Sequence, residues 1–185
     1  ANNLKDSGLK VIVGLKEGGS SWNKAKDDGH EVMSVAEACK KADIIHILIP
    51  DMVQSKVYKD EIEPNISEGN ALAFSHAAAI YWGWIKAPDD VDVIMVAPKG
   101  PGSKVRETYL DGFGTPSIVA VEQDKTGTAW DRTLGIAKGI GSARAGLIKT
   151  TFKEEVETDW FGEQAALCGG SASMVVNAFE TLVEA

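Results

Sequence analysis

The stretch ADIIHILIPDMVQSKVYKDEIEPNISEGNALAFSH, residues 42–76, decides the fold. It begins with a short, continuously apolar run at Ile44–Ile49, continues with helical periodicity over Met52–Ile62, and ends with a second apolar run at Ala71–Phe74. Short apolar runs are typical of strands that are covered on both faces, and a helix between two of them is typical of a parallel β-α-β unit. This stretch therefore predicts an α/β protein.

The same alternation continues on both sides of this stretch. Ser34 precedes VAEACKKA with Glu37 three residues later, which predicts a capping box, and Asp51 is expected to cap the helix after Pro50. We expect a Rossmann-like, doubly wound, mostly parallel sheet with helices on both faces. The other predicted strands are Leu9–Val13, Val91–Val96, Ser117–Val121 and Ala145–Thr150, and the other predicted helices are Ser21–Asp28, Val35–Lys41, Lys104–Leu110 and Thr126–Ile140.

Both ends of the chain depart from the alternation. Residues 152–185 contain no strand pattern but two helical stretches, Lys153–Cys168 and Ser171–Glu184, on either side of a glycine pair. We therefore expect a dinucleotide-binding domain over residues 1–151 and the start of a helical domain over residues 152–185. The opening ANNLKDSG reads as the tail of a helix, so the usual first strand and its GxGxxG turn, which holds a pyrophosphate, are expected to be missing.

The composition is that of an ordinary globular protein. The 185 residues are 44% hydrophobic and 25% charged, which suits one domain with an appendage. The longest uncharged apolar run, Ile44–Pro50, is far shorter than the ~20 residues that span a bilayer, so no contact with a membrane is expected. The first residues lack the basic and apolar regions of a secretion signal, so we expect a cytoplasmic protein.

Charge and cysteine content exclude further classes. The net charge of −8 argues against a nucleic-acid partner, because such binding needs a basic face. Cys39 and Cys168 are too few and too far apart for a disulfide scaffold or a zinc cluster, and we expect both to be buried thiols. A small-molecule enzyme or an interaction domain remains.

An acidic segment, EEVETDWFGE, carries five acids within residues 154–163. Asp159 and Glu163 are four residues apart, so on a helix both carboxylates lie on one face and can share a divalent cation that prefers oxygen ligands. The alternative is a solvated acidic face.

Two further candidates follow predicted strands, where α/β proteins place their ligands. Lys99 lies in VAPKGPG, a loop restrained by glycine and proline, where a lysine can face an oxyanion. His76 follows the strand ALAFS. The alternatives are a surface lysine in a turn and a structural histidine, and His30 and His46 are expected to be structural.

The loop LKEGGSSW, residues 15–22, follows the first visible strand. In a dinucleotide-binding fold this position meets the adenosine ribose, where basic and hydroxyl groups favour a 2′-phosphate. Lys16, Ser20 and Ser21 indicate a phosphate, whereas Glu17 weakens the signal. A polar loop without a ligand is the alternative.

Together these segments resemble the ketol-acid reductoisomerase family, NADPH- and magnesium-dependent enzymes of branched-chain amino-acid biosynthesis. The resemblance covers almost the whole chain. It rests on LKDSGLKVIVGLKEGGSSWNKA, ADIIHILIPDMVQ, EIEPNISEGNALAFSH, VDVIMVAPKGPG, KGIGSARAG, TTFKEEVETDWFGEQAALCGG and FETLVEA.

The resemblance implies a reaction and a set of site residues. The substrate is a 2-acetyl-2-hydroxy acid such as 2-acetolactate, in which an alkyl group migrates before NADPH reduces the product to a 2,3-dihydroxy acid. The implied roles are magnesium ligands at Asp159 and Glu163, with Asp159 bridging two ions; catalytic residues at His76 and Lys99; contacts to the 2′-phosphate from Lys16 and Ser21; and cofactor contacts from Asp51, Gln54 and Pro101.

Three departures from the family pattern bear on activity. The chain begins after the family's opening strand and GYGSQGHAQ turn, and it ends before the knotted helical domain that supplies further carboxylates and a serine. Ala77-Ala78-Ala79 stand where the family has Gly-Phe-Asn, and the aromatic run Tyr81–Trp84 follows. We therefore expect weak cofactor and magnesium binding.

These departures leave other interpretations open. One is a catalytically inactive fragment or an engineered scaffold that carries the family's α/β body. Another is a composite site that a second chain completes. Apolar residues near the end also predict a homo-oligomer or a complementing chain on the last helices, through Val175, Val176, Phe179 and Leu182.

Overall fold

The computed structural model describes all residues, 1–185, and its strands form two sheets. The larger sheet has the order β3 (Ile44–Ile47), β4 (Ala71–Phe74), β5 (Asp92–Pro98), β6 (Ser117–Gln123) and β7 (Leu147–Lys149). All its neighbouring strands are parallel except β5 and β6, which confirms a mostly parallel sheet.

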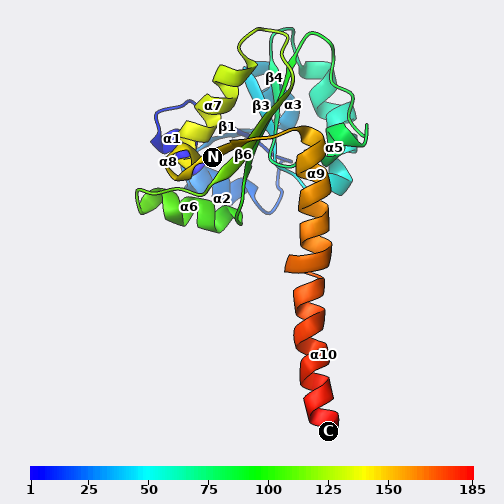
Figure 1. Ribbon diagram of the computed structural model, residues 1–185. Coiled ribbons are helices and arrows are strands. Elements are labelled where there is room, and N and C mark those ends of the chain that lie inside the picture. The colour runs from blue at the N-terminus through cyan, green and yellow to red at the C-terminus, as the bar shows by residue number, and fades with distance from the viewer.

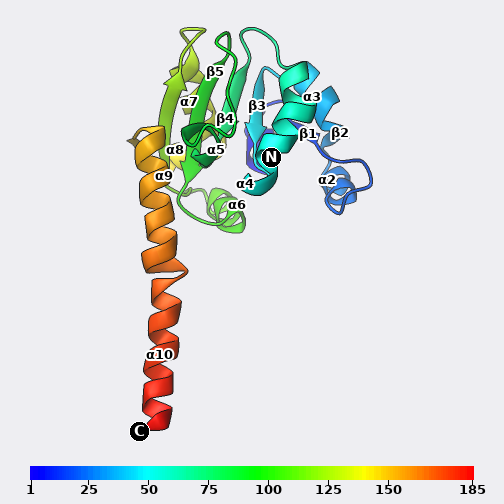
Figure 2. The same cartoon turned by 90° about the vertical axis from the view of Figure 1, so that its right-hand side faces the viewer.

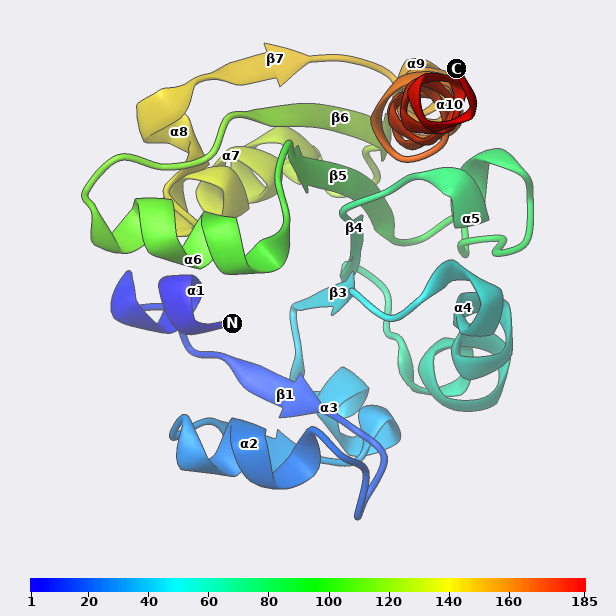
Figure 3. The same cartoon turned by 90° about the horizontal axis from the view of Figure 1, so that it is seen from below.

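The smaller sheet pairs β1 (Ile12–Gly14) with β2 (Glu31–Met33) in parallel. The hydropathy pattern missed β2, because Glu31, Val32 and Met33 do not form a continuous apolar run. β1 and β3 are not paired, so the two sheets are separate (Figure 3).

Helices cover both faces of the larger sheet, as expected (Figure 3). One side carries α1 (Asn2–Asp6), α6 (Gly102–Leu110), α7 (Ala129–Gly139) and α8 (Ser142–Ala145). The other side carries α3 (Val35–Lys41), α4 (Asp51–Val57), α5 (Ala78–Tyr81) and α9 (Phe152–Phe161), while α2 (Trp22–Asp27) lies beside the smaller sheet. α4 continues as the π-helix η1 (Tyr58–Ile62) and the 3₁₀ turn η2 (Glu63–Asn65).

The strands are continuously apolar because both of their faces are buried. Leu72, Phe74, Val93 and Met95 pack on the side of α9, and the alternate residues of β4 and β5 pack on the side of α7. Full burial of such side chains contributes roughly 1.5–3 kcal/mol each. This rigid pair of central strands positions the residues that follow them.

Of the two helix N-caps predicted from the sequence, the structure contains one. Ser34 and Glu37 form the expected capping box of α3. The cap predicted at Asp51 is wrong, because Pro50 occupies the N-cap position and Asp51 is the first helical residue. The Asp51 carboxylate instead accepts a hydrogen bond from the Gln54 side chain at 2.9 Å.

One helical rod leaves the body and carries the C-terminus (Figures 1 and 2). It comprises α9, the π-helix η3 (Gly162–Leu167) and α10 (Gly170–Glu184). A turn at Cys168–Gly169 separates η3 from α10, so two helical stretches flank this point as expected. The backbone passes close to itself here because Gly169 and Gly170 carry no side chains that would collide with the carbonyl groups of Gln164 and Ala165.

The rod, Phe152–Glu184, is long and apolar enough to cross a membrane by length and composition alone. It has 33 residues, with an 18-residue stretch of mean hydropathy 1.3. The short run Ile44–Pro50 does not represent this segment, because polar residues such as Ser171, Ser173 and Asn177 interrupt its apolar pattern. Core helices of soluble proteins have the same two properties.

Candidate functional site

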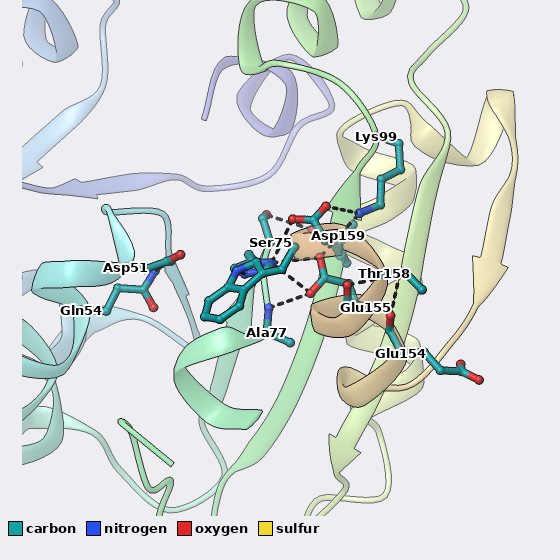
Figure 4. A network of polar contacts seen from close by, with 12 residues as sticks. Asp51, Gln54, Ser75, Ala77, Lys99, Glu154, Glu155, Thr158 and Asp159 are labelled. Carbon is teal, nitrogen blue, oxygen red and sulfur yellow. Dashed lines mark hydrogen bonds and ion pairs between the residues drawn. The ribbon is translucent and has the colours of Figure 1, made fainter. Parts of the chain in front are cut away.

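The site lies where β4 and β5 end and α9 passes over them (Figure 4). His76 follows β4, and Lys99 directly follows β5. Because the two strands are parallel, their carboxyl ends meet at one edge of the sheet, and this is the edge where α/β proteins bind ligands.

Glu155 is the centre of the cluster, and sequence reasoning missed it. Its side chain is 1% exposed. It accepts hydrogen bonds from the backbone N–H of Ala77 at 3.0 Å and from His76 Nδ1 at 3.2 Å, and Lys99 Nζ lies 3.5 Å from Oε1. A signal was present, since Glu155 precedes Asp159 by one helical turn and lies next to the core residue Val156.

Asp159 completes the cluster on the next turn of α9. Lys99 Nζ donates to its Oδ1 at 3.0 Å, and His76 Nδ1 lies 3.5 Å from its Oδ2. The Asp159 side chain is 31% exposed, so water reaches this end of the cluster. Asp159 thus contacts both His76 and Lys99, three residues that the sequence indicated separately.

The pKa values of the two histidines near this edge are shifted in opposite directions. Burial lowers the pKa of His76, but the hydrogen bond to Glu155 and the charges of Glu155 and Asp159 outweigh it, so the pKa is raised. Burial lowers the pKa of His46 to about 4, and its Nε2 contacts the Ser75 hydroxyl at 3.0 Å. His46 is therefore a neutral structural residue, as expected.

Glu163, the second predicted metal ligand, does not contact the cluster. It lies in η3, where the α-helical register gives way to a π-helix. Its Oε2 accepts a hydrogen bond from the Cys168 thiol at 2.6 Å, and this contact raises the pKa of Cys168. Cys39 is buried as expected, but Cys168 is exposed, because no part of the chain covers the rod at this point.

Ala77, Ala78 and Ala79, where the resemblance implies Gly-Phe-Asn, are all buried. Ala78 and Ala79 begin α5, which packs against α9. The backbone N–H of Ala77 binds Glu155, so this segment helps to hold the carboxylate in place. Small side chains suit this close packing of two helices.

The predicted phosphate loop forms a separate hollow of about 170 Å³. It contains the hydroxyls of Ser20 and Ser21 and the cation of Lys16, groups that fit an anion. The lining residues are Leu15, Lys16, Gly19, Ser20, Ser21 and Trp22.

The remaining predicted cofactor residues lie at the starts of two helices. Gln54 is buried, and its Nε2 donates to Ile49 O and to Asp51 Oδ1, both at 2.9 Å. The Gln54 Oε1 atom is buried and has no donor within the chain, which leaves one acceptor available to a ligand. Pro101 is the exposed N-cap of α6.

Two family models match the chain. Residues 1–146 match the acetohydroxy acid isomeroreductase NADPH-binding domain, and residues 152–185 match the ketol-acid reductoisomerase C-terminal domain. The two matches meet close to the start of the rod.

Known proteins are similar along the whole chain. The ketol-acid reductoisomerases (NADP(+)) of Cenarchaeum symbiosum and Methanocaldococcus jannaschii are 82% and 60% identical over 185 residues, which are 100% of this chain and 56% of each relative. A solved NADH-preferring ketol-acid reductoisomerase from an uncultured archaeon has a TM-score of 0.95 and 46% identity, over 100% of this chain and 57% of that one. The chain thus spans about half the length of the relatives it matches.

Proposed function

The chain belongs to the ketol-acid reductoisomerase family, and we propose that it supplies the cofactor-binding body and part of the metal site of such an enzyme. The reaction would be magnesium-dependent alkyl migration in a 2-acetolactate-type acid, followed by reduction with NADPH to a 2,3-dihydroxy acid. The observation that carries the proposal is the convergence of His76, Lys99, Glu155 and Asp159 at the carboxyl ends of β4 and β5.

The acidic cluster fits magnesium by the chemistry of its donors. Hard cations prefer carboxylate oxygens and keep several waters, and Asp159 offers such oxygens at a partly exposed edge. Asp159 would hold the ion, and Glu163 would join it from the next turn of the rod only after its side chain leaves the Cys168 thiol. Magnesium and NADPH, when bound, supply a Lewis acid and a hydride respectively.

The chain's own residues prepare the reacting centre. Lys99 compensates part of the negative charge of Glu155 and Asp159 and places an ammonium group where it would stabilise an oxyanion of the substrate. Glu155 orients His76 and Lys99 from a buried position. These preset contacts reduce the rearrangement that catalysis requires.

The body fits NADPH at two places. Lys16, Ser20 and Ser21 line a hollow that suits the 2′-phosphate, and the unpaired Oε1 of buried Gln54 offers an acceptor along the cofactor. Asp51 lies beside Gln54, and Pro101 would lie near the nicotinamide.

The division at the start of the rod also belongs to the proposal. Residues 1–151 would form the dinucleotide-binding domain, and residues 152–185 would begin the helical domain. The exposed apolar residues of α10 would then pack against further helical protein, from a second copy or a complementing chain, rather than against lipid. A biosynthetic enzyme of this kind would act in the cytoplasm.

The test is a titration of the purified chain with NADPH, with and without magnesium, followed by nicotinamide fluorescence. We expect saturable binding of NADPH. The variant Ser21→Asp should weaken this binding roughly tenfold, because its carboxylate repels the 2′-phosphate. Glu17→Gln is the matched control in the same loop and should not weaken binding. Addition of 2-acetolactate then tests for oxidation of NADPH.

The outcomes separate the interpretations. Turnover supports a reductoisomerase whose site the chain, or an oligomer of it, completes. Binding without turnover supports a cofactor-binding body that needs further protein for catalysis. No binding at millimolar NADPH contradicts the proposal and favours an inactive fragment or scaffold.

A further inference from the structure

The imidazole of His76 is hydrogen-bonded to the indole of Trp160, the residue after Asp159. Trp160 Nε1 and His76 Nε2 are 2.9 Å apart, and the two rings are stacked with centroids 6.2 Å apart. An indole N–H can only donate a hydrogen bond. His76 Nε2 is therefore the acceptor and carries no proton in this arrangement.

The other ring nitrogen requires the same tautomer. His76 Nδ1 lies 3.2 Å and 3.1 Å from the two carboxylate oxygens of Glu155, and 3.5 Å from Asp159 Oδ2. Ionised carboxylates only accept hydrogen bonds, so the proton of the neutral ring belongs on Nδ1. Two independent contacts, one on each side of the ring, thus select the Nδ1–H form.

Trp160 is itself held in place by the aromatic run that follows α5. Its ring is stacked with Trp82 at 5.8 Å between centroids and tilted against Trp84 at 6.3 Å. Trp82 packs edge-on against Tyr81 at 4.7 Å, and the Tyr81 hydroxyl donates to Glu157 Oε1 at 2.8 Å. These four residues form an aromatic wall that ties α5 to α9.

We propose that Trp160 is a positioning residue that acts through His76, fixing its Nδ1–H tautomer and occupying the Nε2 lone pair, with Trp82 and Trp84 holding the indole in place. The catalytic meaning of this arrangement rests on the proposed function, but the arrangement itself does not. His76 then has no free lone pair at Nε2 while the indole stays in place. It acts in the site through Nδ1, which donates to Glu155.

The hydrogen bond is tested directly by NMR on the chain with ¹⁵N-labelled histidine and tryptophan, at a pH where His76 is neutral. With three histidines and five tryptophans, the signals are assigned from the spectra of His76→Gln and Trp160→Phe. We expect a pyrrole-type Nδ1, a pyridine-type Nε2, and scalar coupling across the hydrogen bond between Trp160 Nε1 and His76 Nε2. A pyridine-type Nδ1, or the absence of coupling, overturns the proposal.

The positioning role is tested after the closer of the two carboxylates at His76 Nδ1, that of Glu155, is removed. In Glu155→Gln, Trp160 still donates to Nε2, so His76 should stay in the Nδ1–H form. In Glu155→Gln/Trp160→Phe the ratio of the Nε2–H to the Nδ1–H form should rise at least fivefold. The control is Glu155→Gln/Trp130→Phe, because Trp130 lies on α7, where its ring packs against Lys149 and contacts neither His76 nor the aromatic wall.

The controls keep the outcome decisive. A switch in Glu155→Gln alone, or no switch in the variant that also lacks Trp160, contradicts the role. If the variants at Glu155 fail to fold, the scalar coupling between Trp160 and His76 in the unaltered chain still tests the proposed hydrogen bond. Neither NADPH nor magnesium is present, so failure here leaves the proposed function untouched, and loss of cofactor binding would leave this inference untouched.

Discussion

α9 and α10 are parts of one rod, yet they differ in burial and in the partners that their surroundings give to a carboxylate. α9 buries Phe152, Glu155 and Val156 against the body, whereas no residue of α10 is buried. Glu155 consequently has three partners from the body, while Glu163, two turns later, is paired only with its own helix through Cys168.

The difference shows how a carboxylate becomes part of a site. Both acids lie in a helix with apolar neighbours, so helical periodicity does not distinguish them. Contact with the body removes Glu155 from water, and its charge is then compensated by Lys99 and by N–H donors. We expect the following changes to separate the two parts of the rod.

Hydrogen exchange should give the largest contrast. An isolated helix of about 15 residues is marginal in water, whereas amides in buried strands open only with the whole domain. Amides of α10 should therefore exchange at least about 10⁴-fold faster than those of β4 and β5, with α9 protected like the body. Mass spectrometry at micromolar protein measures this, and protection of α10 that grows with concentration would instead indicate a covered apolar face.

Phe152→Ala should lower the free energy of unfolding by about 3–5 kcal/mol, because it opens a cavity in the core where the rod joins the body. Phe179→Ala is the matched control on α10, where the side chain is 67% exposed, and should change stability by less than about 0.5 kcal/mol. Urea denaturation compares the two variants. Equal losses would mean that α10 is packed in solution.

Glu155→Ala should cost about 2–3 kcal/mol, since it leaves the Ala77 N–H without its acceptor and His76 and Lys99 without their buried counter-charge. Glu163→Ala, on the exposed part of the rod, should cost less than about 0.5 kcal/mol. The same denaturation experiment applies. A small loss at Glu155 would show that water replaces the carboxylate at this junction.

Asp159→Asn should weaken magnesium binding roughly tenfold, about 1.4 kcal/mol, while changing the free energy of unfolding by no more than about 1 kcal/mol. The side chain is partly exposed, so its contact with Lys99 contributes little to stability. Calorimetric titration with magnesium measures the affinity, with Glu154→Gln as the control on the same helix. An unchanged titration excludes Asp159 as a ligand.

Much of the fold was predictable from local patterns. The continuous apolar runs at β3–β6 follow from burial on both faces, and the capping box of α3 follows from Ser34 and Glu37. β2 was missed because it is short and half exposed, and the Asp51 cap failed because Pro50 takes that position. The two helical stretches beside the glycine pair were predicted, but their alignment into one rod was not, because the close approach of the backbone at Gly169 and Gly170 leaves no periodic pattern.

The site was predictable only one residue at a time. Strand ends indicated His76 and Lys99, and helical spacing indicated Asp159, but no local pattern could tell that Glu155 is buried between them. That fact depends on how α9 packs on β4 and β5, which is a tertiary property. The π-helical turn that directs Glu163 to Cys168 is likewise invisible in a periodicity of 3.6 residues.

Lowering the pH should destabilise the body but not the rod. The expected loss in the free energy of unfolding is the smallest of these effects, about 1 kcal/mol, and comes from Asp92 at the start of β5. Burial raises the pKa of Asp92, but hydrogen bonds from Thr126 and the Lys125 N–H, with the charge of Arg132, outweigh it and lower the pKa below 3.8. A depressed folded pKa stabilises the fold above the unfolded value, and this contribution is lost as the pH falls through the folded value.

The stability difference between the unaltered chain and Asp92→Asn should therefore be full near pH 6 and shrink below about pH 4. The control is Glu180→Gln on exposed α10, whose difference should stay near zero at every pH because no partner there holds the carboxylate. Urea denaturation at several pH values measures both. If the stability difference between the unaltered chain and Asp92→Asn did not change with pH, the hydrogen-bond geometry at residue 92, and not its negative charge, would be what stabilises the fold.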